Sequence, residues 1–173
     1  AVSGEEHLRS RENFIFASNH VSYADPLVVG CSLDREVWFL AKKELFRNRL
    51  FGALIRAYHA IPVDREEIER KTMKKIFETL GAGRAVLMFP EGTRSRNGSL
   101  GALKPGLGFT AINAGVSVVP VYVTGTNRLG ACLTRRSKLR VRIGPPIRVP
   151  RGAPGEARNA DSRVRTGRGA RER

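Results

Sequence analysis

Residues 13–28 read NFIFASNHVSYADPLV and predict the first structural unit of the fold. The apolar start of this stretch, NFIFAS, is rich in β-favouring side chains and predicts a buried strand. After a loop at residues 20–24, Asp25 and Pro26 predict a helix start, because a carboxylate can accept from free N–H groups and proline suits the first helical position. The stretch therefore predicts a strand, a loop and a helix that ends near Leu33.

Strands and helices alternate along the rest of the chain. Apolar runs predict further strands at residues 37–41, 61–63, 84–89, 118–123 and 139–143. Helical patterns cover residues 42–58, as one broken helix or two short ones, the segment from a capping box of Asp64 and Glu67 to Gly81, and residues 106–114. This alternation predicts an α/β fold, a three-layer sandwich in which helices flank a central, mixed but mostly parallel sheet. Pro120 predicts an edge strand or a bulge, because proline cannot donate to a strand ladder.

The basic charge of the chain is concentrated near its end. The 173 residues fit one domain, and the net charge is +15. Residues 135–173 hold 13 basic and 3 acidic residues, which gives +10 of that total. Because Val164 is the only large apolar residue after position 150, we expect one folded domain at 1–150 and a disordered tail at 151–173. Such a tail attracts anionic lipid and nucleic acid equally well.

The cysteines and the hydropathy of the chain argue against a metal site and against a membrane-spanning helix in this sequence. Cys31 and Cys132 have no Cys or His companions at metal-ligand spacing, so we expect reduced, buried thiols and no metal site. No stretch approaches the roughly 18 apolar residues of a spanning helix, and no signal-peptide pattern opens the chain. Because the chain begins with Ala1 rather than methionine, a membrane anchor ahead of it stays an open alternative.

The loop at residues 19–25, NHVSYAD, carries the first candidate for chemistry. In a strand-to-helix turn His20 and Asp25 can meet, whereas on a continuous helix they would lie on different faces. A carboxylate bonded to one ring nitrogen fixes the tautomer and stabilises the imidazolium, which suits a general base. The alternative is that Asp25 only caps the helix and His20 is a loop residue bonded to it. Ser22 is a poor candidate for a nucleophile because the chain has no GxSxG elbow.

The segment FPEGTRSR, residues 89–96, carries the second candidate. It follows a predicted strand, and ligands gather beyond the carboxyl ends of strands in open α/β sheets. Gly92 allows close approach of the backbone, while Thr93 and Arg94 offer donors that suit phosphate. Other basic residues are candidates for anion contacts, each with a solvated charge as the alternative: Arg65 beside a predicted helix start, Lys42, Lys43 and Lys104.

Four blocks of the sequence resemble those of a known family. They are NHVSYAD at 19–25, AIPVDR at 60–65, FPEGTRS at 89–95 and VPVYV at 119–123. In their order and spacing the chain resembles the lysophosphatidic acid acyltransferases of the glycerolipid acyltransferase superfamily. The resemblance covers residues 13 to about 127 and implies a glycerol-3-phosphate acyltransferase-like fold.

The resemblance also implies an activity and a set of site residues. It implies transfer of a fatty acyl group from acyl-CoA or acyl carrier protein to the sn-2 hydroxyl of 1-acylglycerol 3-phosphate, giving phosphatidic acid, with no metal or cofactor. His20 would be the general base and Asp25 its partner. The acceptor's phosphate would be held by Arg65, Glu91, Gly92, Thr93 and Arg94, to which we add Lys104. Because a carboxylate repels phosphate, we expect Glu91 to orient Arg94 or a loop amide.

The expected partners are an acyl thioester donor, a lysophospholipid acceptor and an anionic membrane surface, with the protein peripheral on the cytoplasmic face of the cell membrane. One alternative keeps the chemistry but changes the acceptor to glycerol 3-phosphate, another lysophospholipid, a glycolipid or an amino-lipid. Another alternative is a basic nucleic-acid-binding module. The latter is disfavoured, because the charge lies mainly in the tail and no RNP, zinc-finger or helix-turn-helix pattern is present.

Overall fold

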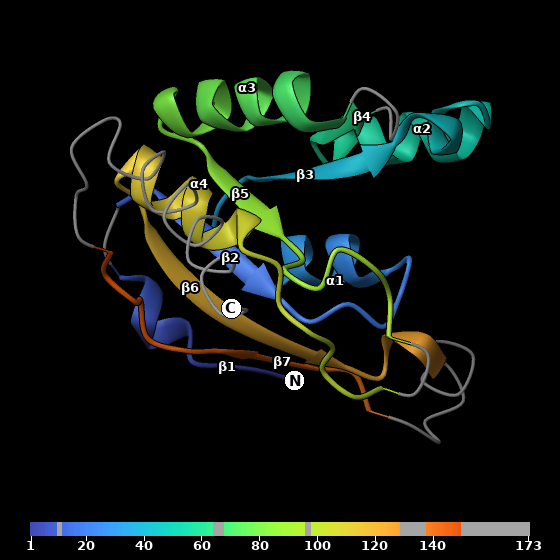
Figure 1. Cartoon of the computed structure of the whole chain (residues 1–173). Helices are drawn as coiled ribbons and strands as arrows, with labels where there is room; N and C mark the ends of the chain where they lie inside the picture. Colours follow the sequence, from blue (N-terminus) through green and yellow to red (C-terminus); the bar gives the residue numbers. More distant parts are fainter. Residues whose placement is uncertain (10–11, 64–67, 96–97, 129–137, 150–173) are drawn as a thin grey trace, which may run out of the picture.

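The computed structural model describes residues 1–9, 12–63, 68–95, 98–128 and 138–149, without the side chains of 68–70. Within these residues one seven-stranded sheet has the order β1-β7-β6-β2-β5-β3-β4. The strands are β1 (Val2–Ser3), β2 (Phe14–Ser18), β3 (Val37–Lys42), β4 (Ala60–Val63), β5 (Ala85–Met88), β6 (Ser117–Thr124) and β7 (Arg140–Ile143). Neighbours pair in parallel except β6 and β7, which are antiparallel. Figure 1 shows the strands succeeding one another from β4 near the top to β1 at the bottom.

Helices cover both faces of the sheet in the described part of the chain. They are α1 (Asp25–Cys31), α2 (Arg49–Ala57), α3 (Ile68–Gly81) and α4 (Gly106–Ala114), with the short 3-10 helices η1 (Glu5–Leu8), η2 (Lys43–Phe46) and η3 (Thr126–Arg128). Val29 of α1 and Ile55 of α2 belong to the core on one face. Ile76 of α3 and Ala111 of α4 belong to the core on the other face. The predicted three-layer sandwich with a mixed, mostly parallel sheet is thus confirmed.

The strand β2 lies at the centre of the sheet, between β5 and β6. Its Phe14, Ile15 and Phe16 are all 0% exposed. Successive side chains of a strand point to opposite faces, so Phe14 and Phe16 join one core cluster and Ile15 joins the other. Burial on both faces explains why the strand is a continuous apolar run rather than an alternating one.

Pro120 does not mark an edge strand, as the sequence left open. It lies in β6, which has β2 on one side and β7 on the other. The pairing with β7 includes Val121 with Ile143, and a separate bridge joins Val118 to Ile147. Between these two pairs β6 advances by three residues, from Val118 to Val121, whereas the opposing segment advances by four, from Ile143 to Ile147. Pro120 lies within this irregular stretch. The bulge alternative describes the position better, because no regular ladder bond is required there.

The prediction of a buried Cys31 is wrong. The thiol is free and exposed at the last residue of α1. Side chains two residues apart on a helix point about 200° apart, so Cys31 faces away from the sheet when Val29 faces it. The strand β1 and helix η1 were not predicted, because so short an element has no pattern of its own. Several predicted features lie outside the described residues: Cys132, the capping box of Asp64 and Glu67, Arg65, and the tail at 151–173.

The side chain of Asn19 extends the pairing between β2 and β6 beyond the last residue of β2. Its Nδ2 donates to the Val123 carbonyl at 2.9 Å, and its Oδ1 accepts from the Val123 N–H at 2.7 Å. Asn19 is only 7% exposed, so water does not compete for these bonds. The amide therefore fixes the point at which the loop after β2 leaves the sheet.

We predict that Asn19→Ala lowers the free energy of unfolding by about 2 kcal/mol or more, because each buried polar group left unsatisfied costs about 1–3 kcal/mol. Urea denaturation followed by circular dichroism measures the change. Asn113→Ala is the matched control, since Asn113 bonds to the Phe109 carbonyl on an exposed helix surface and its loss should cost no more than about 0.5 kcal/mol. Equal midpoints for the two variants would contradict the prediction.

Candidate active site

A cleft of about 480 Å³ opens where β2, β3 and β5 end. Its polar lining residues include His20 and Thr93, and its apolar ones include Phe39 and Phe51. Among the described residues that line the cleft, Lys42 and Arg94 are basic and none is acidic. The cleft therefore suits a molecule with an anionic group and an apolar portion.

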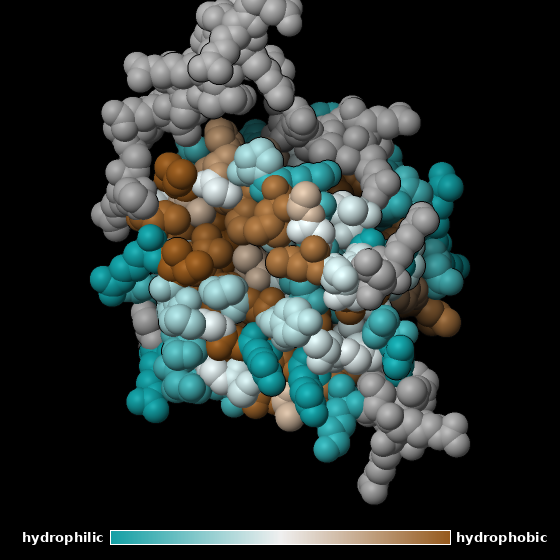
Figure 2. Space-filling model, turned by 60° about the horizontal axis from the view of Figure 1, so that its bottom comes forward, coloured by the Kyte–Doolittle hydropathy of each residue, from teal (hydrophilic) through white to brown (hydrophobic). Residues whose placement is uncertain are grey.

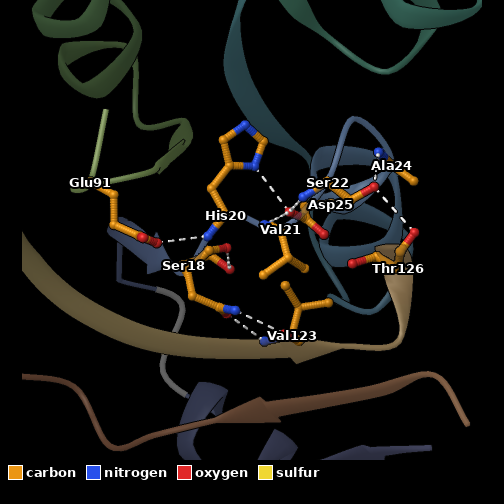
Figure 3. Close-up of polar contacts among 10 residues, drawn as sticks. Ser18, His20, Val21, Ser22, Ala24, Asp25, Glu91, Val123 and Thr126 are labelled. Carbon is orange, nitrogen blue, oxygen red and sulfur yellow. Dashed lines mark hydrogen bonds and ion pairs between the residues drawn. The ribbon is translucent and has the colours of Figure 1, made fainter. Parts of the chain in front are cut away.

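His20 and Asp25 meet in the loop that follows β2. The distance between His20 Nδ1 and Asp25 Oδ2 is 3.0 Å, and Figure 3 shows the second ring nitrogen pointing away from the carboxylate. The carboxylate is 0% exposed, whereas 18% of the imidazole is exposed. Because the carboxylate accepts, Nδ1 carries the proton and Nε2 keeps a lone pair. The imidazole can thus take a proton from a group bound in the cleft.

The Asp25 carboxylate organises the loop ahead of it rather than the helix behind it. Its Oδ2 accepts from the N–H of Val21 at 2.7 Å and also from the N–H of Ser22. The helix α1 has Ala24 as its N-cap residue and no side-chain cap bond. The expectation that Asp25 accepts from the free N–H groups of the helix is therefore wrong, although Pro26 does lie at the helix start as predicted.

Glu91 joins two loops through its buried carboxylate. Its Oε1 accepts from the His20 N–H at 2.9 Å, and its Oε2 accepts from the Gly101 N–H at 2.9 Å. The residue is only 4% exposed, and Figure 3 shows its carboxylate directed at the His20 backbone. The Ser95 N–H also donates to the His20 carbonyl at 2.7 Å. The loop after β5 therefore holds the backbone of His20 through both the N–H and the carbonyl of this residue.

Two aromatic contacts connect the same pair of loops. The rings of His20 and Phe89 are stacked, with centroids 4.0 Å apart and planes inclined by 24°. The guanidinium of Arg94 lies 3.7 Å above the centroid of Tyr23. Stacking restricts the imidazole to one orientation, and the exposed tyrosine ring holds the arginine at the edge of the cleft.

The structure brings together some of the predicted site residues but not all of them. His20, Gly92, Thr93 and Arg94 line the cleft, and Asp25 lies behind His20. Glu91 faces loop amides, one of the two roles expected of it, and not Arg94.

Lys104 does not line the cleft. Its side chain lies over Gly92, where an added Cβ would come within 2.8 Å of the Lys104 Nζ. Gly92 also has a φ of 67°, so both its backbone and its neighbour favour glycine. Lys104 therefore packs in this loop, and its contact with phosphate stays a prediction.

Sequence reasoning missed the roles of Asn19, Phe89 and Tyr23. Each stands inside a block that the sequence singled out, but its partner comes from a distant segment. Within the described ranges, no cluster of three His, Cys, Asp or Glu side chains is placed to bind a metal ion. The helices in the same ranges are all too short or too polar to cross a bilayer.

Comparison with known proteins gives one consistent result. Residues 1–124 match the family model described as Acyltransferase. The chain is 31% identical over 147 residues to the 1-acyl-sn-glycerol-3-phosphate acyltransferase of Bacillus subtilis, covering 84% of this chain and 72% of that protein. It is 34% identical over 140 residues to the protein of the same name from Streptococcus pneumoniae, covering 80% of this chain and about half, 51%, of that protein.

A solved structure agrees with these relatives. The crystal structure of the 1-acyl-sn-glycerophosphate (LPA) acyltransferase PlsC from Thermotoga maritima superimposes with a TM-score of 0.71 at 26% sequence identity. The match covers 100% of this chain and 73% of that one.

We predict that Glu91→Ala speeds hydrogen exchange in the loop that carries His20, because two buried N–H groups lose their acceptor. Stability should fall as well, since each unsatisfied donor costs about 1–3 kcal/mol. Exchange mass spectrometry of peptides covering residues 19–25 measures the first effect. Glu78→Ala serves as the control, because Glu78 is 60% exposed and pairs only loosely with Lys74 at 3.8 Å. Unchanged exchange in the Glu91 variant would rule out the role given to this carboxylate.

Proposed function

The chain belongs to the acyltransferase family, and from this premise we propose that it transfers a fatty acyl group from a thioester donor, acyl-CoA or acyl carrier protein, to the sn-2 hydroxyl of 1-acylglycerol 3-phosphate. The product is phosphatidic acid. The observation that carries the proposal is the His20–Asp25 pair in a cleft that Arg94 also lines. The acceptor is the one that the names of the Bacillus and Streptococcus relatives give.

His20 acts as the general base in this proposal. Its Nε2 takes the proton of the acceptor hydroxyl while the oxygen attacks the thioester carbonyl. When the C–S bond breaks, the imidazolium returns that proton to the leaving thiolate. Asp25 stabilises the imidazolium between these two steps, and its burial keeps water from weakening the interaction. His20 thus moves a proton and forms no covalent bond to the acyl group.

The acceptor's phosphate is held by Arg94, with Thr93 and the Gly92 backbone beside it. Arginine offers planar paired donors to phosphate, and Arg94 is already oriented by Tyr23. Lys42, which also lines the cleft, adds a second positive charge to it. Arg65, outside the described residues, is a further contact that the sequence resemblance supports. Binding the phosphate places the hydroxyl near His20, so binding energy from a non-reacting group is used for orientation.

A membrane surface is part of the proposal. An acceptor with one acyl chain partitions into bilayers, and a net charge of +15 favours an anionic lipid surface. We place the enzyme as a peripheral protein on the cytoplasmic face of the cell membrane.

We predict that the purified chain, given labelled acyl-CoA, acylates 1-acylglycerol 3-phosphate with a higher kcat/KM than glycerol 3-phosphate, lysophosphatidylcholine or 1-acylglycerol. His20→Ala should lower kcat by about 10²–10⁴-fold, the contribution typical of a general base. His7→Ala, in η1, is the matched control and should retain the rate. A near-wild-type rate in His20→Ala, or a preference for an acceptor without phosphate, would overturn the proposal.

We predict that Arg94→Ala raises the KM for 1-acylglycerol 3-phosphate by about 10-fold or more with a smaller change in kcat, since a charged hydrogen bond contributes about 1.5–3 kcal/mol. Tyr23→Leu should produce a weaker effect in the same direction, and Tyr23→Phe should restore the wild-type KM because the ring face remains. Steady-state kinetics at saturating donor measure these constants.

Arg84→Ala is the control for this series. Arg84 also lies over an aromatic ring, that of Trp38, at 4.8 Å, but it is absent from the cleft lining. An equal rise in KM for the Arg84 and Arg94 variants would contradict the assignment of the phosphate site.

A further inference from the structure

The helix α2 has an inner face that belongs to the cleft. Phe51 and Ile55 line the cleft, and Ile55 is 3% exposed. Gly52 lets the helix lie close to η2, because an added Cβ would come within 2.8 Å of the Phe46 carbonyl oxygen. The start of the helix is fixed by Asn48, whose side chain accepts from the Phe51 N–H at 2.9 Å. These contacts fix the position of α2 relative to η2 and to the cleft.

Part of the outer face of α2 is an apolar stripe where a solvated helix would be polar. Leu50 is 87% exposed, Leu54 44% and Tyr58, just past the helix end, 38%. A spacing of four residues puts these three side chains in one stripe along the helix. A hydrogen bond with the Cys31 side chain raises the pKa of Tyr58 above its ordinary value, so the phenol is uncharged at neutral pH. A single exposed leucine is ordinary, but an aligned stripe indicates a surface that meets an apolar partner.

The exposed surface of the same segment outside this stripe is basic. Residues 42–58 contain five basic residues, Lys42, Lys43, Arg47, Arg49 and Arg56, and one acidic residue, Glu44. Arg47, Arg49 and Arg56 are exposed, and the guanidinium of Arg56 lies 5.1 Å from the centroid of Phe46. Arg49 and Arg56 lie about 100° or more around the helix axis from each residue of the stripe. An apolar stripe with arginines on the polar side is the composition of a helix that lies in the interface of an anionic bilayer.

We propose that α2 docks on an anionic phospholipid bilayer through its apolar stripe of Leu50, Leu54 and Tyr58, assisted by the exposed Arg47, Arg49 and Arg56 of the same segment. This inference rests on the proposed function, since a lipid acceptor would then leave the bilayer beside the helix that forms one wall of the cleft. Leu50 and Leu54 insert between headgroups, and the arginines lie against lipid phosphates. In Figure 1, α2 lies at the same end of the molecule as the arrowhead of β3, where the cleft opens.

A second apolar region of the surface lacks the charge that an anionic bilayer requires. A groove of about 490 Å³ runs between the loop after β5, α4 and β6, with Leu103 and Ile147 exposed by 60% and 56%. Figure 2 shows apolar side chains gathered on the face of the molecule that carries this groove. Arg142 is the only charged residue among the described residues that line it. The groove therefore provides a control of similar exposure and different charge.

The experiment measures co-sedimentation of the 173-residue chain with vesicles of phosphatidylcholine and phosphatidylglycerol, and with vesicles of phosphatidylcholine alone. Leu50→Ser/Leu54→Ser should lower the partition coefficient by about tenfold or more. Arg47→Gln/Arg49→Gln should do so only for the anionic vesicles, by a similar factor. Leu103→Ser/Ile147→Ser is the matched control and should bind as the wild type does. Every variant retains residues 150–173, so the basic tail contributes equally to each measurement.

Activity measurements separate this inference from the proposed function. With a short-chain acceptor dissolved as monomers, Leu50→Ser/Leu54→Ser should keep the wild-type rate, whereas its rate on vesicle-embedded acceptor should fall. The proposed function fails if the wild type is inactive on every phosphorylated acceptor, and the vesicle measurement remains informative in that case. The docking inference is overturned if the wild type does not bind anionic vesicles. It is also overturned if the α2 leucine variant binds as well as the wild type, or if the groove variant loses as much binding as the α2 variant.

Discussion

Two buried carboxylates hold three consecutive backbone N–H groups of the loop after β2, and the geometry of the site depends on these bonds. Glu91 accepts from the N–H of His20, and Asp25 accepts from those of Val21 and Ser22. The carboxylates approach from different segments, one after β5 and one at the start of α1. A short loop has no regular hydrogen-bonding partner for its amides, so buried acceptors determine its shape. Asp25 also bonds to the His20 ring, which ties the backbone conformation to the orientation of the imidazole.

The position of β2 in the sheet explains why segments distant in sequence meet at His20. Since β2 has β5 on one side and β6 on the other, its carboxyl end adjoins the loops that follow both strands. The loop after β5 supplies Glu91 and the ring of Phe89, while β6 supplies the backbone of Val123 for Asn19. A polar residue at the end of a buried strand must find a partner, and each of these partners is another part of the same site. The hydrogen bonds that satisfy these buried polar groups therefore also position the side chains of the site.

The sequence could predict what depends on local pattern, and could not predict what depends on distant partners. The apolar run at 13–18 gave a buried strand, and the spacing of His20 and Asp25 gave a pair that can meet in a turn. The side-chain bonds of Asp25 to the preceding loop were not foreseeable, because capping of the following helix is an equally good local solution. The prediction for Pro120 rested on its missing N–H. Whether a proline can be accommodated at that position depends on the irregular pairing with the neighbouring segment, which the sequence does not show. The position of the Lys104 side chain over Gly92 was likewise not visible in the sequence.

The two faces of α2 connect the cleft with the surface of the molecule. Phe51 and Ile55 are among the apolar side chains that line the cleft, and His20 and Arg94 are among the polar ones. In the proposed function, an amphiphile would place its charged group and its reacting hydroxyl near the polar side chains, with its acyl chain near the apolar ones. The same helix exposes Leu50 to the exterior, so apolar surface continues from the wall of the cleft to its rim. With α2 docked as proposed, a lipid would enter the cleft without carrying its chain through water, which would cost about 0.8 kcal/mol for each methylene exposed.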